Sequence, residues 1–342
     1  MQSSATAMIF MNIILSTILV SSSNNWLLAW MGLELNTLSV LPLISKTKHP
    51  RAIEASTKYF LTQATASCLL LLSGTLNAWQ TGSWNITQMS DEVSSTIMLI
   101  SLTMKMGTVP MHFWLPEVMQ GTSLFTAMLI STWQKIAPMT LLFTTSNHSM
   151  SHITLTMGLL STFFGGWGGM NQTQLRKMMA FSSIANMGWT LVTLTSEPKT
   201  SLINILTYII MTIPTFMLLM LTSTKTLQNM TTLWTTSPLM STLLALLILS
   251  TAGLPPLTGF MPKLLILDEL MIQNLPPIAI SMAMASLISL LFYLRITYLA
   301  SLLISPSSST SMTKWRQKMN TTKMTMLTPT ALATITVLPT LL

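Results

Sequence analysis

The stretch Met104-Lys105-Met106-Gly107-Thr108-Val109-Pro110-Met111-His112-Phe113-Trp114-Leu115-Pro116-Glu117 places a lysine inside an apolar run and follows it with glycine and proline. Glycine and proline in such a run predict an interrupted helix. A cation at the depth of a lipid bilayer costs from about 2.5 to more than 10 kcal/mol. The lysine is therefore a functional hypothesis, provided that the rest of the chain places it inside a membrane.

The composition is that of an integral membrane protein. Of the 342 residues, 50% are hydrophobic and 7% are charged, far below the roughly 25% charge of a soluble domain. The apolar runs of about 18 to 25 residues favour spanning helices over the shorter alternating segments of a β-barrel. Lys and Arg account for the net charge of +8 and stand beside apolar runs, which indicates membrane topology and no nucleic-acid partner.

Residue types argue against metals and redox cofactors in this chain. The single cysteine, Cys68, excludes iron–sulfur ligation, zinc clusters built on cysteine and an internal disulfide. No two His, Cys or carboxylate side chains have metal-ligand spacing on one helix face, and no glycine-rich nucleotide motif occurs. We therefore expect no metal site and no cofactor site.

Eleven apolar runs predict an all-α polytopic membrane protein with about 11 transmembrane helices. The ninth run is too long for one straight span, and Gly253-Leu254-Pro255-Pro256 interrupts it. We therefore expect two half-helices within one crossing. The predicted spans are 6–21, 26–44, 56–79, 94–110, 122–145, 150–168, 174–195, 199–222, 238–271, 277–303 and 325–342.

Basic residues in the connections alternate with the order of the spans. The loops after odd-numbered spans hold only Lys199 among basic residues. By the positive-inside rule, this alternation supports the span count, places the amino terminus on the inner side and the carboxyl terminus on the opposite face. The basic residues after even-numbered spans are Lys46, Lys48, Arg51, Arg176, Lys177, Lys225, Lys314, Arg316, Lys318 and Lys323.

Two predicted spans are broken in the same way, span four beside Lys105 and span nine beside Lys263. Paired interruptions in two halves indicate a transporter repeat, and the odd offset of five spans inverts the second copy. We predict a single antiporter-like membrane domain over 1–342. Its parts are inverted five-helix repeats at about 6–145 and 150–303, broken helices at about 94–121 and 238–271, and an appended helix at about 325–342.

Four protonatable residues inside the predicted spans are the candidates for chemistry: Glu34, Lys105, Lys135 and Lys263. Burial and nearby charge can poise such groups near neutrality, which a proton relay needs. The alternative is that some of them form structural ion pairs or extend their charge to the membrane interface. The relay is the leading hypothesis because intramembrane charges are functional by default.

Each candidate has its own local context. Glu34 has no basic residue within a helical turn, so we expect a partner from another span and choose Lys105. In this hypothesis, separating the pair lowers the proton affinity of Lys105 and drives its proton towards Lys135.

Pro138 frees backbone carbonyls that can hold water near Lys135. The alternative is a plain kink, with a lysine side chain that extends to the membrane interface. His112 could extend the relay or lie at the level of the lipid headgroups.

Two further patterns have structural interpretations. Glu54 and Lys58 are four residues apart and predict an ion pair on a helix surface. The small residues in Gly165-Gly166-Trp167-Gly168-Gly169 predict close packing between helices.

Five stretches carry a family resemblance: Trp26–Glu34, Ala55–Ala64, Lys105–Glu117, Asn171–Lys177 and Gly253–Lys263. Together they resemble the NADH:ubiquinone oxidoreductase chain 2 family, the antiporter-like subunits of respiratory complex I that animal mitochondria encode. The resemblance covers about residues 8 to 300. The key glutamate and three lysines of the family match Glu34, Lys105, Lys135 and Lys263 in this chain.

The resemblance implies a core membrane-arm subunit that translocates protons across the mitochondrial inner membrane. NADH oxidation and ubiquinone reduction would occur in other subunits, so NAD, FMN, iron–sulfur clusters and ubiquinone would belong to the complex. The implied partners are chains 4L and 4 and inner-membrane lipids, with cardiolipin at the basic loops. The amino terminus would lie on the matrix side and the carboxyl terminus on the intermembrane-space side.

The chain departs from the family at Asn186, where vertebrate relatives commonly have histidine. Asparagine can order water but cannot titrate, so no proton-carrying role follows there. Two alternative functions stay open at this point. One is an Mrp-type cation/proton antiporter subunit, and the other is a structural subunit that couples its neighbours and moves no proton.

Overall fold

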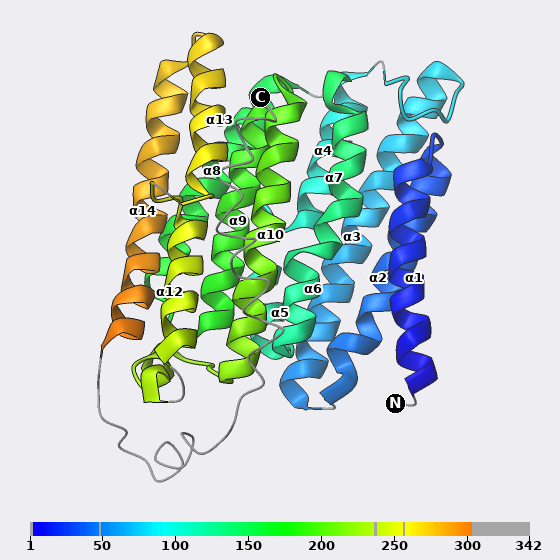
Figure 1. The fold of residues 1–342 in the computed structure, drawn as a ribbon. Helices are drawn as coiled ribbons and strands as arrows, with labels where there is room; N and C mark the ends of the chain where they lie inside the picture. Colours follow the sequence, from blue (N-terminus) through cyan, green and yellow to red (C-terminus); the bar gives the residue numbers. More distant parts are fainter. Residues whose placement is uncertain are drawn as a thin grey trace. The chain divides into compact units, whose positions relative to one another are not determined.

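The computed structural model describes residues 3–47, 49–89, 91–148, 150–235, 238–255 and 257–302. Within these ranges the secondary structure consists of helices and two isolated β-bridges. The α-helices are α1 (Ser3–Ser22), α2 (Trp26–Ile44), α3 (Pro50–Thr81), α4 (Glu92–Met106), α5 (Trp114–Gly121), α6 (Leu124–Ser131), α7 (Ile136–Thr144), α8 (Ser151–Met170), α9 (Leu175–Thr193), α10 (Pro198–Thr222), α11 (Leu227–Met230), α12 (Pro238–Ala252), α13 (Phe260–Ile272) and α14 (Pro276–Ser301) (Figure 1).

The helical membrane fold expected from the composition is confirmed. Helices α1, α2, α3, α10 and α14 are long and apolar enough to cross a bilayer, where only helices and closed barrels satisfy every backbone polar group. Large apolar side chains such as Met8, Leu15 and Ile18 lie on the outside of α1. The count of about 11 spans stays a prediction, and its last member, 325–342, lies outside the described residues.

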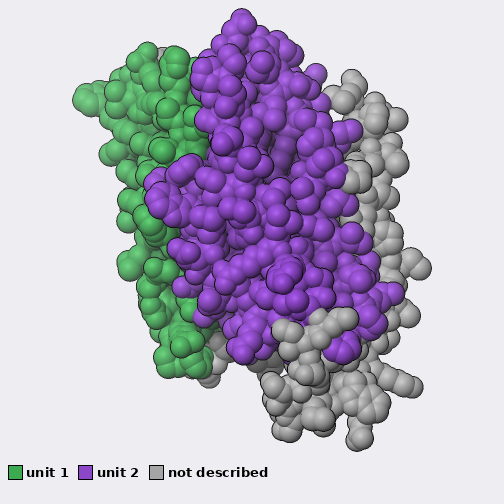
Figure 2. Space-filling view, turned by 90° about the vertical axis from the view of Figure 1, so that its left-hand side faces the viewer, with its two compact units in different colours: residues 1–161, 191–198 green, residues 162–190, 199–342 purple. Residues whose placement is uncertain are grey.

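The chain divides into two compact units, which Figure 2 shows in different colours. Unit 1 comprises Met1–Ser161 and Leu191–Pro198; unit 2 comprises Thr162–Thr190 and Lys199–Leu342. In unit 1, α3 packs against α2, α4 and α5, while α1 packs against α2 and α7. In unit 2, α14 packs against α11, α12 and α13.

The glycines of α8 pack closely against other helices, which confirms the interpretation of that motif. A Cβ atom at Gly165 would lie 2.6 Å from the backbone nitrogen of Ala185 on α9. A Cβ atom at Gly169 would lie 2.8 Å from the ring of Phe292 on α14. Only residues without a side chain allow helices to approach this closely.

Both predicted helix interruptions are confirmed. Helix α4 ends at Met106, directly before Gly107, and α5 begins at Trp114. Helix α12 ends at Ala252, directly before Gly253, and α13 begins at Phe260. Gly107 has φ 75° and Gly253 has φ 79°. Because this left-handed region suits glycine, each glycine ends its half-helix without strain.

A third interruption divides the predicted span 122–145, in the segment where we expected Pro138 to free backbone carbonyls near Lys135. Helix α6 ends at Ser131, a 3-10 turn covers Trp133–Lys135, and α7 begins at Ile136. Pro138 lacks the N–H group that would bond the carbonyl four residues earlier, and its ring crowds the preceding turn. The proline therefore acts one turn before its own position, on the segment that holds Lys135.

The predicted ion pair between Glu54 and Lys58 is confirmed, with Nζ and Oε1 2.5 Å apart. Lys58 also pairs with Glu117 of α5, with 2.6 Å between Nζ and Oε2. This second contact joins α3 to the half-helix α5. All three side chains are substantially exposed, so each pair contributes little to stability on its own.

Candidate functional site

Unit 1 contains three of the four predicted relay residues, on three different elements. Glu34 is half-buried on α2. Lys105 is 5% exposed in the last turn of α4, directly before the break, and Lys135 is 2% exposed in the 3-10 turn between α6 and α7. The two lysines are therefore buried at helix interruptions, where backbone groups lack regular helical partners.

Lys105 lines a small internal cavity of about 10 Å³. Its other polar lining includes Asn36 and Thr37 of α2, Gln63 of α3, and Gln134. A space of this size is near the lower limit for one water molecule, and a buried water needs two to four polar partners. The lining supplies them, so the cavity suits a single ordered water beside the lysine.

Uncharged polar side chains connect the elements around this cavity. The Nε2 group of Gln134 donates to Oδ1 of Asn36 at 3.0 Å, and the hydroxyl of Tyr59 donates to Oε1 of Gln134 at 3.5 Å. The Nε2 group of Gln63 donates to the backbone carbonyl of Lys105 at 3.5 Å. These residues were not among the candidates predicted from the sequence, although their amides inside apolar runs were a signal that could have identified them.

The Lys105 ammonium has no hydrogen-bond partner among the described residues. In the same part of the chain, Glu34 and Lys105 do not form a direct ion pair. Glu34 instead accepts a hydrogen bond from the Thr37 hydroxyl at 3.3 Å, and its carboxylate acts on Lys105 through space. The structure thus brings this predicted pair within electrostatic reach and not into contact.

His112 lies in the connection between α4 and α5 and is 5% exposed. Its ring stacks beside Phe113, with 4.1 Å between the ring centroids. Trp114 is also buried, and its Nε1 group donates to the Met104 carbonyl at 3.1 Å. Neither His112 nor Trp114 is an exposed side chain of the kind that lies among lipid headgroups.

Lys263, the fourth predicted relay residue, belongs to unit 2. It lies in the first turn of α13, and its Nζ donates to the Ala252 carbonyl at the end of α12, at 2.6 Å. The ammonium also lies 5.8 Å from the centroid of the Trp189 ring. Lys263 therefore spans the interruption between α12 and α13.

Unit 2 has a small polar cavity of its own, also of about 10 Å³. Its lining includes Asn186, Asn204 and Thr251, together with Pro262, the neighbour of Lys263. The Nδ2 group of Asn204 donates to the Asn186 carbonyl at 3.3 Å. Asn186 thus contributes polar groups at the wall of a water-sized space.

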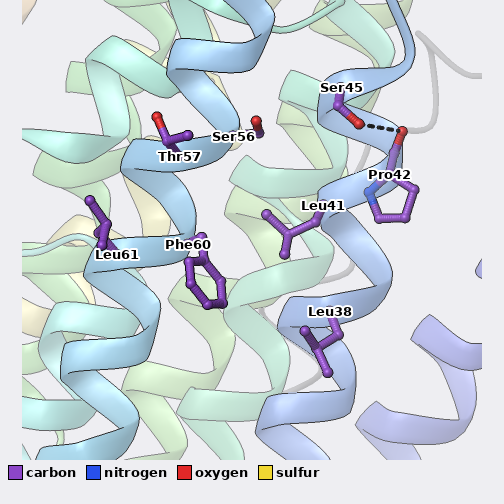
Figure 3. A pocket seen from close by; sticks show the side chains of 8 residues that line it. All are labelled: Leu38, Leu41, Pro42, Ser45, Ser56, Thr57, Phe60 and Leu61. Atoms are coloured by element: carbon purple, nitrogen blue, oxygen red, sulfur yellow. Dashed lines mark hydrogen bonds between the residues drawn. The ribbon is translucent and has the colours of Figure 1, made fainter.

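A larger groove runs between α2 and α3 and has a different character (Figure 3). It has a volume of about 620 Å³, and its walls carry no titratable side chain. The lining residues are Leu38, Leu41, Pro42, Ser45, Ser56, Thr57, Phe60 and Leu61. The groove is therefore separate from the candidate relay.

Among the described residues no group of three His, Cys, Asp or Glu side chains could hold a metal ion.

Two family models match the sequence. One, described as NADH:quinone oxidoreductase/Mrp antiporter, TM, matches residues 23–289. The other, described as NADH dehydrogenase subunit 2 C-terminus, matches residues 290–342. A similar curated protein is NADH-ubiquinone oxidoreductase chain 2 of Varanus baritji, which is 51% identical over 328 residues that cover 95% of this chain and 95% of that one.

Solved structures share the fold. Respiratory complex I from Thermus thermophilus contains a chain that matches with a TM-score of 0.84 and 23% identity, over 98% of this chain and 79% of that one. The Mrp complex of a Dietzia species contains a chain that matches with a TM-score of 0.78 and 18% identity, over 89% and 62% of the two chains. At such identities the likeness concerns the fold alone.

Proposed function

The chain belongs to the NADH-ubiquinone oxidoreductase chain 2 family, and on that premise we propose that it moves protons through Glu34, Lys105, Lys135 and Lys263. It is an antiporter-like membrane subunit of respiratory complex I, the complex that oxidises NADH and reduces ubiquinone. The chain's own part is proton translocation, and the redox steps belong to other subunits. NAD, FMN, iron–sulfur clusters and ubiquinone accordingly have their places elsewhere in the complex.

The positions of the three lysines in the structure are the main support for this proposal. Lys105, Lys135 and Lys263 each lie at a helix interruption, and Lys105 lines a water-sized polar cavity. An ammonium group can release a proton to an adjacent water and later recover one, because burial favours the neutral amine and nearby polar groups favour the cation. A chain of such groups and waters moves protons without any bound cofactor.

Glu34 has the role of a tuning group in this relay. Its carboxylate acts on Lys105 through space without touching it, so a small movement of α2 changes the field at the ammonium. When the carboxylate is near, Lys105 holds its proton; when it withdraws, the proton moves on towards Lys135. His112, buried between α4 and α5, is a candidate extension of the path beyond Lys105.

Glu34→Gln is expected to lower the number of protons pumped per NADH oxidised while leaving the complex assembled, because glutamine keeps the volume but removes the charge that tunes Lys105. Proteoliposomes containing the intact complex allow pumping and NADH oxidation to be measured together. Glu54→Gln is the matched control, since Glu54 is an exposed member of an ion pair on α3. An unchanged number of protons pumped per NADH in Glu34→Gln would show that Glu34 does not tune the relay.

The comparisons with known proteins bear on one of the two alternative functions, and an experiment is needed for the other. An Mrp-type antiporter subunit has the same fold, but a relative that is 51% identical over 95% of this chain is a complex I subunit by name. Identity at that level favours complex I over a structural likeness at 18% identity. A structural subunit that moves no proton would explain the fold equally well, and substitution of Lys105 separates it from the relay.

The finer architecture stays a prediction. Ten of the eleven predicted spans coincide with described helices or with pairs of half-helices, which supports the count. The inverted five-helix repeats and the single antiporter-like domain over 1–342 are part of the same proposal. Chains 4L and 4 as neighbours, the inner mitochondrial membrane and the sidedness of the termini follow from the family resemblance.

Cardiolipin is the lipid we expect at the basic connection between α2 and α3. Lys46 in this connection and Arg51 in the first turn of α3 are exposed. Ser45 and Ser56 line the polar end of the groove, and Leu38 and Leu61 line its apolar part (Figure 3). An acyl chain in the groove with an anionic headgroup at the basic residues satisfies both chemistries.

A further inference from the structure

We infer that Trp114 is a positioning residue that keeps the Lys105 ammonium available for proton transfer, an inference that rests on the proposed relay. Trp114 does so by occupying a backbone carbonyl at the end of α4 that the lysine would otherwise bind. The half-helices α4 and α12 end with the same backbone motif. A different side chain donates to the terminal carbonyls of each, and the comparison shows what Trp114 does for Lys105.

Helix α4 ends in a Schellman motif. The N–H group of Gly107 donates to the Met104 carbonyl at 3.1 Å, and the N–H group of Thr108 donates to the Thr103 carbonyl at 3.1 Å. This pair of bonds, three and five residues back along the chain, is the usual way in which a left-handed glycine closes a helix.

Helix α12 ends in the same motif. The N–H group of Gly253 donates to the Ser250 carbonyl at 3.0 Å, and the N–H group of Leu254 donates to the Leu249 carbonyl at 3.5 Å. The sequence spacing matches that in α4 residue for residue. Both half-helices therefore present a closely similar set of terminal carbonyls to whatever side chain lies over the break.

Different side chains donate to those carbonyls in the two units. In unit 1 the indole Nε1 of Trp114 donates to Met104 O at 3.1 Å. In unit 2 the ammonium of Lys263 donates to Ala252 O at 2.6 Å. The end of a helix carries partial negative charge on its last carbonyls and attracts cations. A lysine is thus the expected donor, and unit 1 uses a neutral indole in its place.

Each donor side chain packs directly against the glycine that ends its half-helix. A Cβ atom at Gly107 would lie 3.1 Å from the Trp114 ring, and one at Gly253 would lie 2.9 Å from both Cδ and Nζ of Lys263. Trp114 and Lys263 therefore occupy equivalent places over the two helix ends, although the carbonyls that they bind differ by two positions counted from the glycine.

The consequence is a difference between the two lysines. Lys263 is held by the helix end, whereas Lys105 Nζ has no hydrogen-bond partner among the described residues and lines the same cavity as Trp114. A lysine near a helix carboxyl terminus readily binds the last carbonyls. Without the indole N–H group, Lys105 would turn to the Met104 carbonyl and leave the cavity.

Trp114→Phe tests this directly, because it keeps an aromatic ring and removes the donor. In the intact complex, the part of proton pumping per NADH that Lys105→Ala removes should fall about fivefold, the population change that one hydrogen bond of ordinary strength produces. Trp26→Phe is the control and should pump normally. Trp26 is 1% exposed in the same unit, and its Nε1 has no hydrogen-bond partner among the described residues.

The same substitution in a Lys105→Ala background separates positioning from general packing. If Trp114 acts through Lys105, the double variant pumps as the single Lys105→Ala variant does. An additional loss in the double variant, or normal pumping in Trp114→Phe while Lys105→Ala is defective, overturns the inference and leaves the relay standing. Normal pumping in Lys105→Ala overturns the relay itself.

Should Trp114→Phe prevent assembly, Trp114→His takes its place because it keeps a ring N–H group. Pumping by the histidine variant at the level of the unmodified complex supports the donor role. A loss as large as that of Lys105→Ala in an assembled histidine variant overturns it.

Discussion

Lys105→Ala is expected to slow proton transfer through this subunit by about 100-fold or more, since groups that donate and accept protons in a reaction path commonly contribute 10²–10⁴-fold. Assembly should survive, because alanine suits the last turn of α4 and its introduction removes a buried charge. The measurement is the number of protons pumped per NADH oxidised, in proteoliposomes that contain the intact complex.

The control for this prediction is Lys199→Ala, which removes an exposed lysine at the start of α10. It should leave the proton stoichiometry unchanged. If Lys105→Ala pumps as many protons as this control, the chain is a structural coupling subunit and not a proton carrier.

Gly259→Ala should have the largest effect on stability. A Cβ atom at Gly259 would lie 1.9 Å from the backbone oxygen of Ser250, so the two half-helices α12 and α13 could not approach as they do. Gly259 has φ −69°, and any residue tolerates that conformation; the clash alone is responsible. Overpacking against backbone costs about 1–3 kcal/mol and sometimes more, which should reduce the amount of assembled complex on native gels and lower its unfolding temperature.

Gly74→Ala is the matched control for this substitution. A Cβ atom at Gly74 would lie 3.4 Å from the Trp26 side chain, an ordinary contact, and alanine favours the helical state of α3 by up to about 1 kcal/mol. Equal assembly of the two variants would show that α12 and α13 do not approach each other at Gly259.

The sequence was sufficient to predict both helix breaks, because the cause of each lies within a few residues of the break. Gly107 and Gly253 adopt left-handed backbone conformations that glycine favours. The same reasoning identified Lys105 and Lys263 as residues beside those breaks. Local chemistry of this kind can be read along the chain.

Contacts between distant segments could not be predicted in this way. The bond from Gln134 to Asn36 joins residues 98 positions apart, and the contact of Lys58 with Glu117 joins α3 to α5. The sequence contains many possible partners for such amides and carboxylates, and nothing in it shows which partner each one contacts. The pairing of Glu34 with Lys105 was expected from their places in the sequence, but the through-space form of their interaction depends on packing between α2 and α4.

A continuous proton path needs ordered water between its side chains, so the waters of the intact complex test it most directly. A density map at a resolution that shows individual waters, recorded during turnover and at rest, is the measurement. We expect waters that link Glu34, Lys105, Lys135 and Lys263 in at least one state, including one in the cavity beside Lys105. A dry gap on both sides of Lys135 in every state would contradict it.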